Sequence, residues 1–314
     1  MSADSAATLV QTRSGVYGDA LDFRLPPFMR LAWATPAARK RWLSPMGRLA
    51  HQVRTAEWQS VAAGVRAAAI IAAPRAHIPA LAGEWSRSGL RSLNLGPGDA
   101  MRIHLLNGKT RSPGPADEVH LLARSDRLEE LAAVWRAGDL VRIAGWLGYP
   151  SCCAALLKTA AIEQGCIDTT WAMVRGRSVH ENGLWHADIL DATVNPLLSP
   201  LGLRAVPHRP CSFHCEASRK LAGVYAKIRS GTAPREEDDR LESILGWPMA
   251  WSSLHGIIEI TLPIFKLCHE GDATAATYRI RLTGGPMPEA AANGLAFPHQ
   301  PIAQPPQIDD ETER

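Results

Sequence analysis

The sequence lacks an apolar segment long enough to cross a membrane as a helix. Its most apolar stretch, Val61 to Ala73, is shorter than the roughly 20 residues that a spanning helix needs, and it contains Arg66. Residues 1–14 contain no apolar core of the kind found in export signals. We therefore expect a cytoplasmic protein with no membrane partner, whose cysteines stay reduced.

Several common catalytic motifs are also missing. The sequence contains no GxGxxG after a strand, no GxxxxGK[ST], no HExxH and no GxSxG. Nothing therefore indicates a nicotinamide enzyme, a P-loop nucleotide site, a zincin or an α/β-hydrolase. The spacing Cys211-x3-Cys215 resembles the start of the radical-SAM motif, but the third cysteine of that motif would fall at Ser218. A standard radical-SAM enzyme is excluded.

A large excess of charge of one sign is absent as well. The chain has 34 basic and 31 acidic residues, a net charge of +3. Binding that depends mainly on nucleic-acid phosphates is not expected, although a local patch remains open. Arg39 to Arg75 holds seven basic residues and one acid, Glu57, and its apolar spacing predicts a helix over Pro45 to Ala73. This basic helix is either a solvated surface or a site for an acidic partner.

The composition indicates a folded protein. Of 314 residues, 46% are apolar and 21% are charged, close to ordinary globular averages. Patterns along the chain predict four segments. Residues 1–20 form a disordered tail, 21–115 an Ala/Arg-rich region, 116–285 a cysteine-motif domain, and 286–314 a Pro-rich disordered tail. We expect an α+β fold in which a central helical region carries paired cysteines at helix N-termini and a β-rich segment follows.

Local patterns place the elements around the cysteines. A strand is predicted over Glu118–Ala123, and a helix capped by Ser125 is expected to end at Gly138. A short helix then covers Asp139 to Leu147. Apolar and β-branched residues predict strands between Trp247 and Leu282.

Cysteine is scarce, with six residues, but four of them form two pairs. The first pair, Cys152 and Cys153, follows Ser151, which we interpret as the N-cap of a helix. Both cysteines then lie in the first helical turn. Free N–H groups and the positive end of the helix dipole stabilise a thiolate at that position.

The second pair, Cys211 and Cys215, follows Pro210. Proline favours the start of a helix, which we predict from Pro210 to Ile228. Residues at i and i+4 share one helix face, about 5–6 Å apart at Cβ. This separation suits two thiolates that bind one inorganic centre better than a relaxed disulfide.

If the two helix starts face each other, three or four thiolates converge, from the ligand pool Cys152, Cys153, Cys211 and Cys215. Thiolates favour zinc or an iron–sulfur cluster over hard cations. Adjacent cysteines bind a single tetrahedral ion awkwardly, so we predict a [4Fe–4S] cluster with one open iron, and zinc as the alternative. Thiol chemistry without metal and plain core cysteines remain open. Cys166 and Cys268 stand apart and are expected to be core residues, and Cys268 is the better candidate of the two for a fourth ligand.

Other polar and aromatic residues are candidates for the same site. His208 and Glu216 flank the second pair and could transfer protons. Trp146, Tyr149 and Trp185 are candidate walls of a substrate pocket.

Two further groups of residues have alternative interpretations. The segment from His180 to Asp188 is predicted to be a loop, which connects elements or binds mononuclear non-haem iron. His255 and Glu259 share a strand face and are too far apart to chelate one ion alone.

Three motifs carry a resemblance to a known family. They are Gly148-Tyr149-Pro150-Ser151-Cys152-Cys153, His208-x-Pro210-Cys211-Ser212-x-x-Cys215-Glu216-x-Ser218, and Trp251-x-x-Leu254-His255-Gly256-x-x-Glu259-Ile260 with Asp272-Ala273-Thr274-Ala275. Together they resemble a family of bacterial and archaeal proteins of unknown function, over roughly residues 125–300. The resemblance implies that the two cysteine pairs act together, and it implies no reaction.

The sequence thus predicts an iron–sulfur metalloprotein that acts on a small molecule or peptide, with sulfur transfer or a tailoring step as the reaction class. The first alternative is a zinc-stapled binding module that engages an acidic partner through its basic helix. The second is a mononuclear non-haem iron enzyme, and the third is a redox or metal sensor.

Overall fold

The computed structural model describes residues 28–97, 117–159, 191–231, 235–254, 256–270 and 278–288, together with residues 170, 173, 179–181 and 184–188. The tail predicted at residues 1–20, Cys166, His255 and most of the tail predicted at residues 286–314 lie outside the described residues. No helix in the described part of the chain has the length and apolar character needed to span a membrane.

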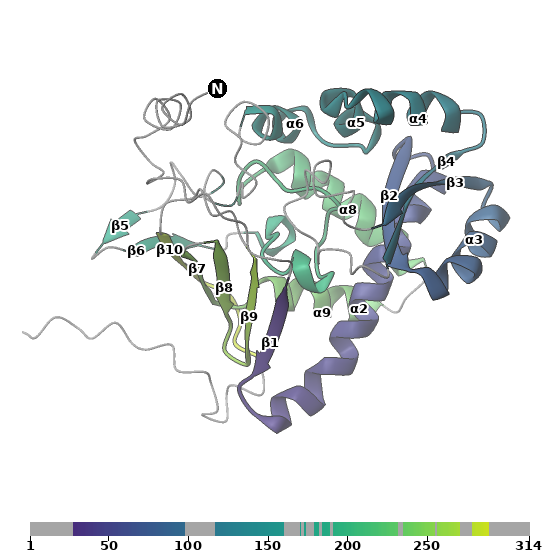
Figure 1. Cartoon of the computed structure of the whole chain (residues 1–314). Coiled ribbons are helices and arrows are strands. Elements are labelled where there is room, and N and C mark those ends of the chain that lie inside the picture. The colour runs from purple at the N-terminus through teal and green to yellow at the C-terminus, as the bar shows by residue number, and fades with distance from the viewer. Residues whose placement is uncertain are drawn as a thin grey trace, which may run out of the picture.

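Helices and two β-sheets make up the described chain, which confirms the α+β class (Figure 1). The strands are β1 (Met29–Trp33), β2 (Ala68–Pro74), β3 (Leu90–Pro97), β4 (Asp117–Arg124), β5 (Val179–Glu181), β6 (Leu184–Asp188), β7 (Met249–Leu254), β8 (Ile257–Thr261), β9 (Phe265–Glu270) and β10 (Tyr278–Thr283). The α-helices are α2 (Pro36–Ala62), α3 (Ile78–Arg87), α4 (Leu128–Ala137), α5 (Leu140–Trp146), α6 (Ser151–Leu157), α8 (Glu216–Ser230) and α9 (Arg235–Leu245). Short 3-10 turns are η1 (Arg75–His77), η4 (Ala192–Val194) and η5 (Ser199–Leu201).

The larger sheet has the strand order β1-β9-β8-β7-β10-β6-β5. Its pairs are antiparallel except β10 with β6, which run parallel. The β-rich segment predicted between Trp247 and Leu282 supplies β7 to β10. Side chains alternate between buried and less buried along β7, as expected for a sheet with one face on a core, and Trp251, Ile260 and Leu267 belong to that core.

The smaller sheet has the order β2-β4-β3, and all its pairs are antiparallel. Apolar side chains pack on both faces: Ile71, Trp85 and Leu122 on one, Leu121 and Leu131 on the other. The predicted strand at Glu118–Ala123 is confirmed as β4. This sheet joins strands from both sides of the boundary predicted at residue 115.

Helix α2 connects the two sheets. It starts earlier than predicted, because Thr35 Oγ1 accepts a hydrogen bond from the Ala38 N–H at 3.0 Å and caps it. It ends at Ala62, so the predicted helix from Pro45 to Ala73 is wrong in its last part, which forms β2. Gly64, with φ of +72°, turns the chain there, and the β-branched residues that follow favour a strand.

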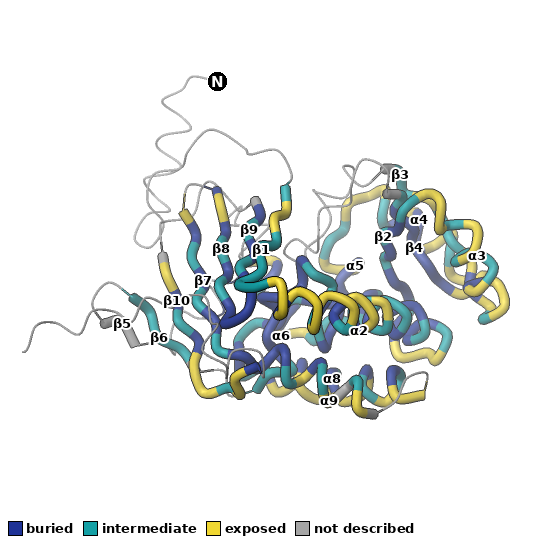
Figure 2. The backbone as a smooth tube through the Cα atoms, turned by 90° about the horizontal axis from the view of Figure 1, so that it is seen from below, coloured by how far each residue is buried: buried dark blue, intermediate teal, exposed yellow. Residues whose placement is uncertain are grey.

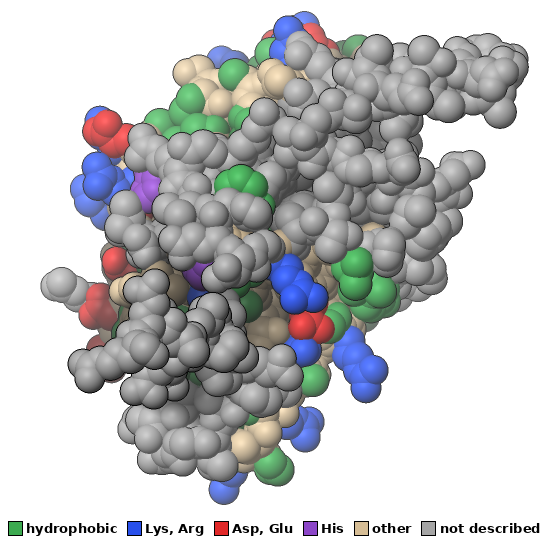
Figure 3. All heavy atoms as spheres, turned by 90° about the vertical axis from the view of Figure 1, so that its left-hand side faces the viewer, with side chains coloured by type: hydrophobic (Ala, Val, Ile, Leu, Met, Phe, Trp, Pro, Cys, Tyr) green, Lys and Arg blue, Asp and Glu red, His purple; other side chains and the backbone are tan. Residues whose placement is uncertain are grey.

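The basic residues of this region lie in different surroundings. Arg39, Lys40 and Arg41 are exposed on the first turns of α2, whose outer side is largely exposed (Figure 2). Arg66, in contrast, is buried, and Arg75 Nε donates a hydrogen bond to Glu118 at 2.6 Å. On the face seen in Figure 3, the described residues carry Lys, Arg, Asp and Glu side chains interspersed.

Three other local predictions are corrected. The helix expected to be capped by Ser125 starts at Leu128 with Arg127 as its N-cap. Gly138 ends it as predicted, and the structure shows this glycine in the left-handed conformation. The loop predicted from His180 to Asp188 is mostly the antiparallel hairpin of β5 and β6. The short helix predicted at Asp139 to Leu147 is confirmed as α5, which Asp139 caps through the Arg142 N–H.

Candidate metal centre

The first cysteine pair is positioned by the turn between α5 and α6. Gly148 has a φ of +75°, and a Cβ added to it would lie 2.9 Å from Cβ of Arg66, so only glycine fits. The carbonyl of Pro150 accepts a hydrogen bond from the N–H of Cys153 at 2.9 Å. Cys152 and Cys153 therefore lie in the first turn of α6, as predicted, but Pro150 rather than Ser151 is the N-cap.

The second pair is positioned by the loop before α8. The predicted helix from Pro210 is wrong, because α8 starts at Glu216 and Cys215 is its N-cap. Cys215 Sγ accepts a hydrogen bond from the Ser218 N–H at 3.4 Å, the role that a side-chain oxygen usually has at this position. Cys211 lies in a bend four residues earlier. A turn, and not a shared helix face, therefore brings the two sulfurs together.

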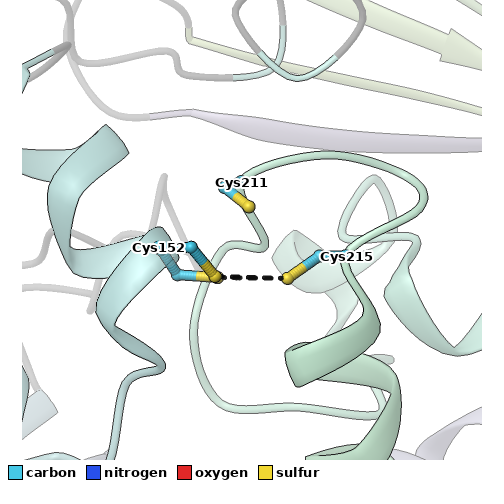
Figure 4. Close-up of side chains that lie close together, drawn as sticks. Cys152, Cys211 and Cys215 are labelled. Atoms are coloured by element: carbon cyan, nitrogen blue, oxygen red, sulfur yellow. Dashed lines mark hydrogen bonds between the residues drawn. The ribbon is translucent and has the colours of Figure 1, made fainter.

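The four sulfurs form one compact group. The Sγ atoms of Cys152, Cys153, Cys211 and Cys215 all lie within 4.8 Å of one another. Cys152 Sγ lies 3.7 Å from Cys215 Sγ and 3.9 Å from Cys153 Sγ, and Cys153 Sγ lies 3.6 Å from Cys215 Sγ. Figure 4 shows the side chains of α6 and of the loop before α8 pointing toward one another. The two distant pairs thus converge as predicted, on a group that could hold a metal ion.

Ser218 and His208 support this group from inside the protein. Ser218 Oγ donates a hydrogen bond to Cys215 Sγ at 3.2 Å and lies 3.3 Å from Cys153 Sγ. His208 is 3% exposed, and its Nε2 lies 2.8 Å from Ser218 Oγ. Because the single hydroxyl proton goes to sulfur, Nε2 carries the ring proton and donates to Ser218. Such contacts orient ligands and fix their lone pairs.

Burial and hydrogen bonding shift the thiol pKa values in opposite directions. Burial raises the pKa of Cys153 well above its usual range, and burial together with the neighbouring Cys215 raises the pKa of Cys211 to about 12. Burial also raises the pKa of Cys215, but hydrogen bonds from Ser218 and from the nearby thiols outweigh it, and the pKa falls to about 7. The group as a whole resists complete ionisation unless a cation neutralises it, and a bound metal ion deprotonates the thiols that coordinate it.

A buried polar network lies beside the centre. Arg66, next to Gly148, donates hydrogen bonds to Ser60 Oγ at 2.8 Å and to the Glu57 carbonyl at 2.5 Å. Tyr225 of α8 also donates to Ser60 Oγ, at 3.2 Å. Burial, with Arg66 as a second cause, lowers the pKa of His208 to about 3, so its imidazole is neutral.

The candidates for proton transfer lie in different environments. His208 contacts the sulfur group through Ser218, and its Nδ1 is buried with no hydrogen-bond partner in the described part of the chain. Glu216 is exposed and forms an ion pair with Lys220 Nζ at 2.9 Å, one helical turn later. Their proposed catalytic roles stay predictions.

The three aromatic candidates lie in two hydrophobic clusters, and their role as pocket walls stays a prediction. Tyr149 packs on the His208 ring with centroids 5.2 Å apart. Trp146 belongs with Tyr149 to the core between the smaller sheet and α4 and α5, and the Arg142 guanidinium lies over its ring. Trp185 of β6 packs against the core of the larger sheet.

The remaining described cysteine lies outside the group. Cys268 is on β9, where its Sγ donates to Glu259 Oε2 at 3.7 Å, and Glu259 is also ion-paired with Lys266. Sequence reasoning missed the supporting role of Ser218. Its position three residues after Cys215 is the N-cap spacing that could have revealed this contact.

Comparison of the chain with protein-family models, with curated proteins and with solved structures gives no match.

Proposed function

We propose that the protein binds one zinc ion through Cys152, Cys153, Cys211 and Cys215, and that this ion holds α6 against the start of α8. The sulfur separations carry the proposal. Tetrahedral zinc with bonds of about 2.3 Å to sulfur places its four sulfurs about 3.8 Å apart. Three of the separations in this group are 3.6, 3.7 and 3.9 Å.

The same distances argue for a single ion over the [4Fe–4S] cluster predicted from the sequence. Each thiolate of a [4Fe–4S] cubane binds a different iron. The four cysteine sulfurs must therefore lie farther apart around a cluster than around a single ion. Sulfurs that all lie within 4.8 Å of one another leave room for one ion. Adjacent cysteines alone bind a single ion awkwardly, but here the other two ligands come from a separate part of the chain, a bend at Cys211 and the N-cap of α8 at Cys215.

A four-thiolate zinc site is typical of a structural role. Four protein ligands complete the tetrahedral coordination of zinc, whereas catalytic zinc sites keep a position for water or substrate. The ligands here come from two places about 60 residues apart, so the ion closes a long loop of the chain. We therefore favour a zinc-stabilised protein over an enzyme that reacts at this centre.

The experiment that tests the proposal is metal analysis of the full chain purified without oxygen. We expect a colourless protein with one equivalent of zinc, and loss of that zinc on treatment with a strong chelator. Iron together with acid-labile sulfide and broad visible absorption would replace the proposal with the [4Fe–4S] centre. A protein without bound metal, unable to take up zinc, would contradict both.

The hydroxyl of Ser218 is expected to strengthen metal binding. Ser218→Ala removes its O–H bond to Cys215 Sγ and its contact with Cys153 Sγ, so we expect zinc affinity to fall by about 10- to 100-fold. Competition with a chromogenic chelator measures this. Ser212→Ala is the matched control, because among the described residues Ser212 Oγ accepts a hydrogen bond from the His214 N–H in the same loop and contacts none of the four sulfurs. Equal affinity of the two variants would show that Ser218 only fills space.

A further inference from the structure

The four sulfurs differ in their access to solvent. Cys152 is exposed, Cys211 is half-buried, and Cys153 and Cys215 are buried. A reagent dissolved in water therefore reaches Cys152 Sγ before the other three. Reactivity of a cysteine follows both access and thiolate character, and a metal-bound sulfur is a thiolate.

The sulfurs also differ in their hydrogen bonds. Cys215 Sγ accepts from both the N–H and the O–H of Ser218, and Cys153 Sγ contacts the same hydroxyl. Within the described chain, the short contacts of Cys152 Sγ are to other sulfurs. Hydrogen bonds to a thiolate stabilise its lone pairs and make it a weaker nucleophile. Cys152 is thus the most accessible of the four cysteines, and, like Cys211 Sγ, its sulfur has no N–H or O–H donor among the described residues.

Cys215 is the best-placed partner for an oxidised Cys152. The two Sγ atoms are 3.7 Å apart, and a disulfide bond of about 2.05 Å would need them to approach by about 1.7 Å. Cys153 Sγ is 3.9 Å from Cys152 Sγ, but it belongs to the adjacent residue, and a disulfide between neighbours on one helical turn is strained. Once two ligand sulfurs are bonded to each other, neither remains a thiolate for zinc.

We propose that Cys152 is an oxidation site for hydroperoxides and that Cys215 is its resolving thiolate, so that oxidation opens the centre and releases zinc. This inference rests on the proposed function, because it concerns the same four sulfurs. It adds a chemical class of reactant and a regulation of metal binding.

The chemistry balances in two steps. In the first, the Cys152 thiolate attacks one oxygen of the hydroperoxide, an S–O bond forms, the O–O bond breaks, and the departing alkoxide or hydroxide takes a proton from water. In the second, the Cys215 thiolate attacks the sulfenic sulfur, the S–S bond forms, the S–O bond breaks, and hydroxide leaves and is protonated. Two thiolates lose two electrons, and the hydroperoxide gains them.

The test uses the zinc-loaded full chain and hydrogen peroxide at one equivalent. We expect zinc release to a chromogenic chelator, and mass spectrometry should identify a disulfide that joins Cys152 to Cys215. A dimedone trap added with the peroxide should label Cys152 first. Cys268→Ser, which changes a cysteine outside the centre, should release zinc at the rate of the parent chain.

Two outcomes would overturn the inference while leaving the proposed function intact. One is a zinc-loaded parent chain in which dimedone labels another cysteine first. The other is a first disulfide that does not include Cys152. If the parent chain holds no zinc, the proposed function fails instead, and the order of labelling and the disulfide identity still decide whether Cys152 is the oxidation site.

Discussion

Cys153→Ala is expected to lose stoichiometric zinc and to unfold at a much lower urea concentration than the parent chain. Cys153 is buried, and its Sγ lies 3.6 Å from Cys215 Sγ and 3.9 Å from Cys152 Sγ. A bound ligand stabilises the folded state by about 4 kcal/mol when its free concentration is 1,000 times the dissociation constant. We expect a loss of that order, measured by urea denaturation with free zinc held constant and by metal analysis.

Two further variants separate loss of the metal from loss of packing. Cys211→Ala removes a half-buried sulfur, leaves a smaller void, and should lose zinc as well. Cys268→Ala removes a half-buried sulfur on β9 and should keep full zinc content. A chelator should lower the stability of the parent chain and leave that of Cys153→Ala unchanged. Full zinc content in both Cys153→Ala and Cys211→Ala would show that the metal is bound elsewhere.

Glu57→Ala is the second substitution for which we expect a large effect. Glu57 lies on α2 and is 4% exposed. Its Oε1 accepts a hydrogen bond from Arg204 Nε at 2.7 Å and forms an ion pair with Arg204 Nη2 at 2.5 Å. Removing one partner of a buried ion pair leaves the other charge without compensation. This typically costs about 3–5 kcal/mol, which urea denaturation measures.

The control for this prediction is Glu216→Ala. Glu216 also pairs with one basic residue, Lys220, but both side chains are exposed. Solvent screens an exposed pair and leaves it little effect on stability, so this variant should unfold close to the parent chain. If both glutamate variants lost the same small amount of stability, the buried Glu57–Arg204 pair would contribute no more to the free energy of unfolding than the exposed pair does.

The sequence was sufficient to predict which cysteines converge. Two pairs separated by many residues, each next to a helix start, indicated a shared centre, and both pairs do flank the N-termini of α6 and α8. The manner of convergence was not predictable from spacing. Cys211-x3-Cys215 matches a helix turn, but Cys215 Sγ itself caps α8, which forces the preceding residues out of the helix.

The C-terminal end of α2 shows a second feature that sequence patterns do not predict. Its apolar spacing continues past Ala62 into residues that form β2, because alanine and isoleucine fit the periodicity of a helix as well as that of a buried strand. The pairing of β2 with β4 decides between them, and β4 lies more than 40 residues later. The burial of Arg66 could not be predicted from the pattern either. Its hydrogen-bond partners, Ser60 and Glu57, lie on α2, and contacts between separate elements leave no mark on local spacing.

Helix α2 has a consequence for the dynamics of the whole chain. Leu49 and Val53 belong to the core of the larger sheet, and Trp58 and Val61 belong to a core on the smaller sheet. A single helix therefore packs into both cores. Neither core can open without exposing part of this helix. Amide hydrogens in its middle turns should therefore exchange with deuterium only when both ends are released, which makes them the slowest reporters of global unfolding.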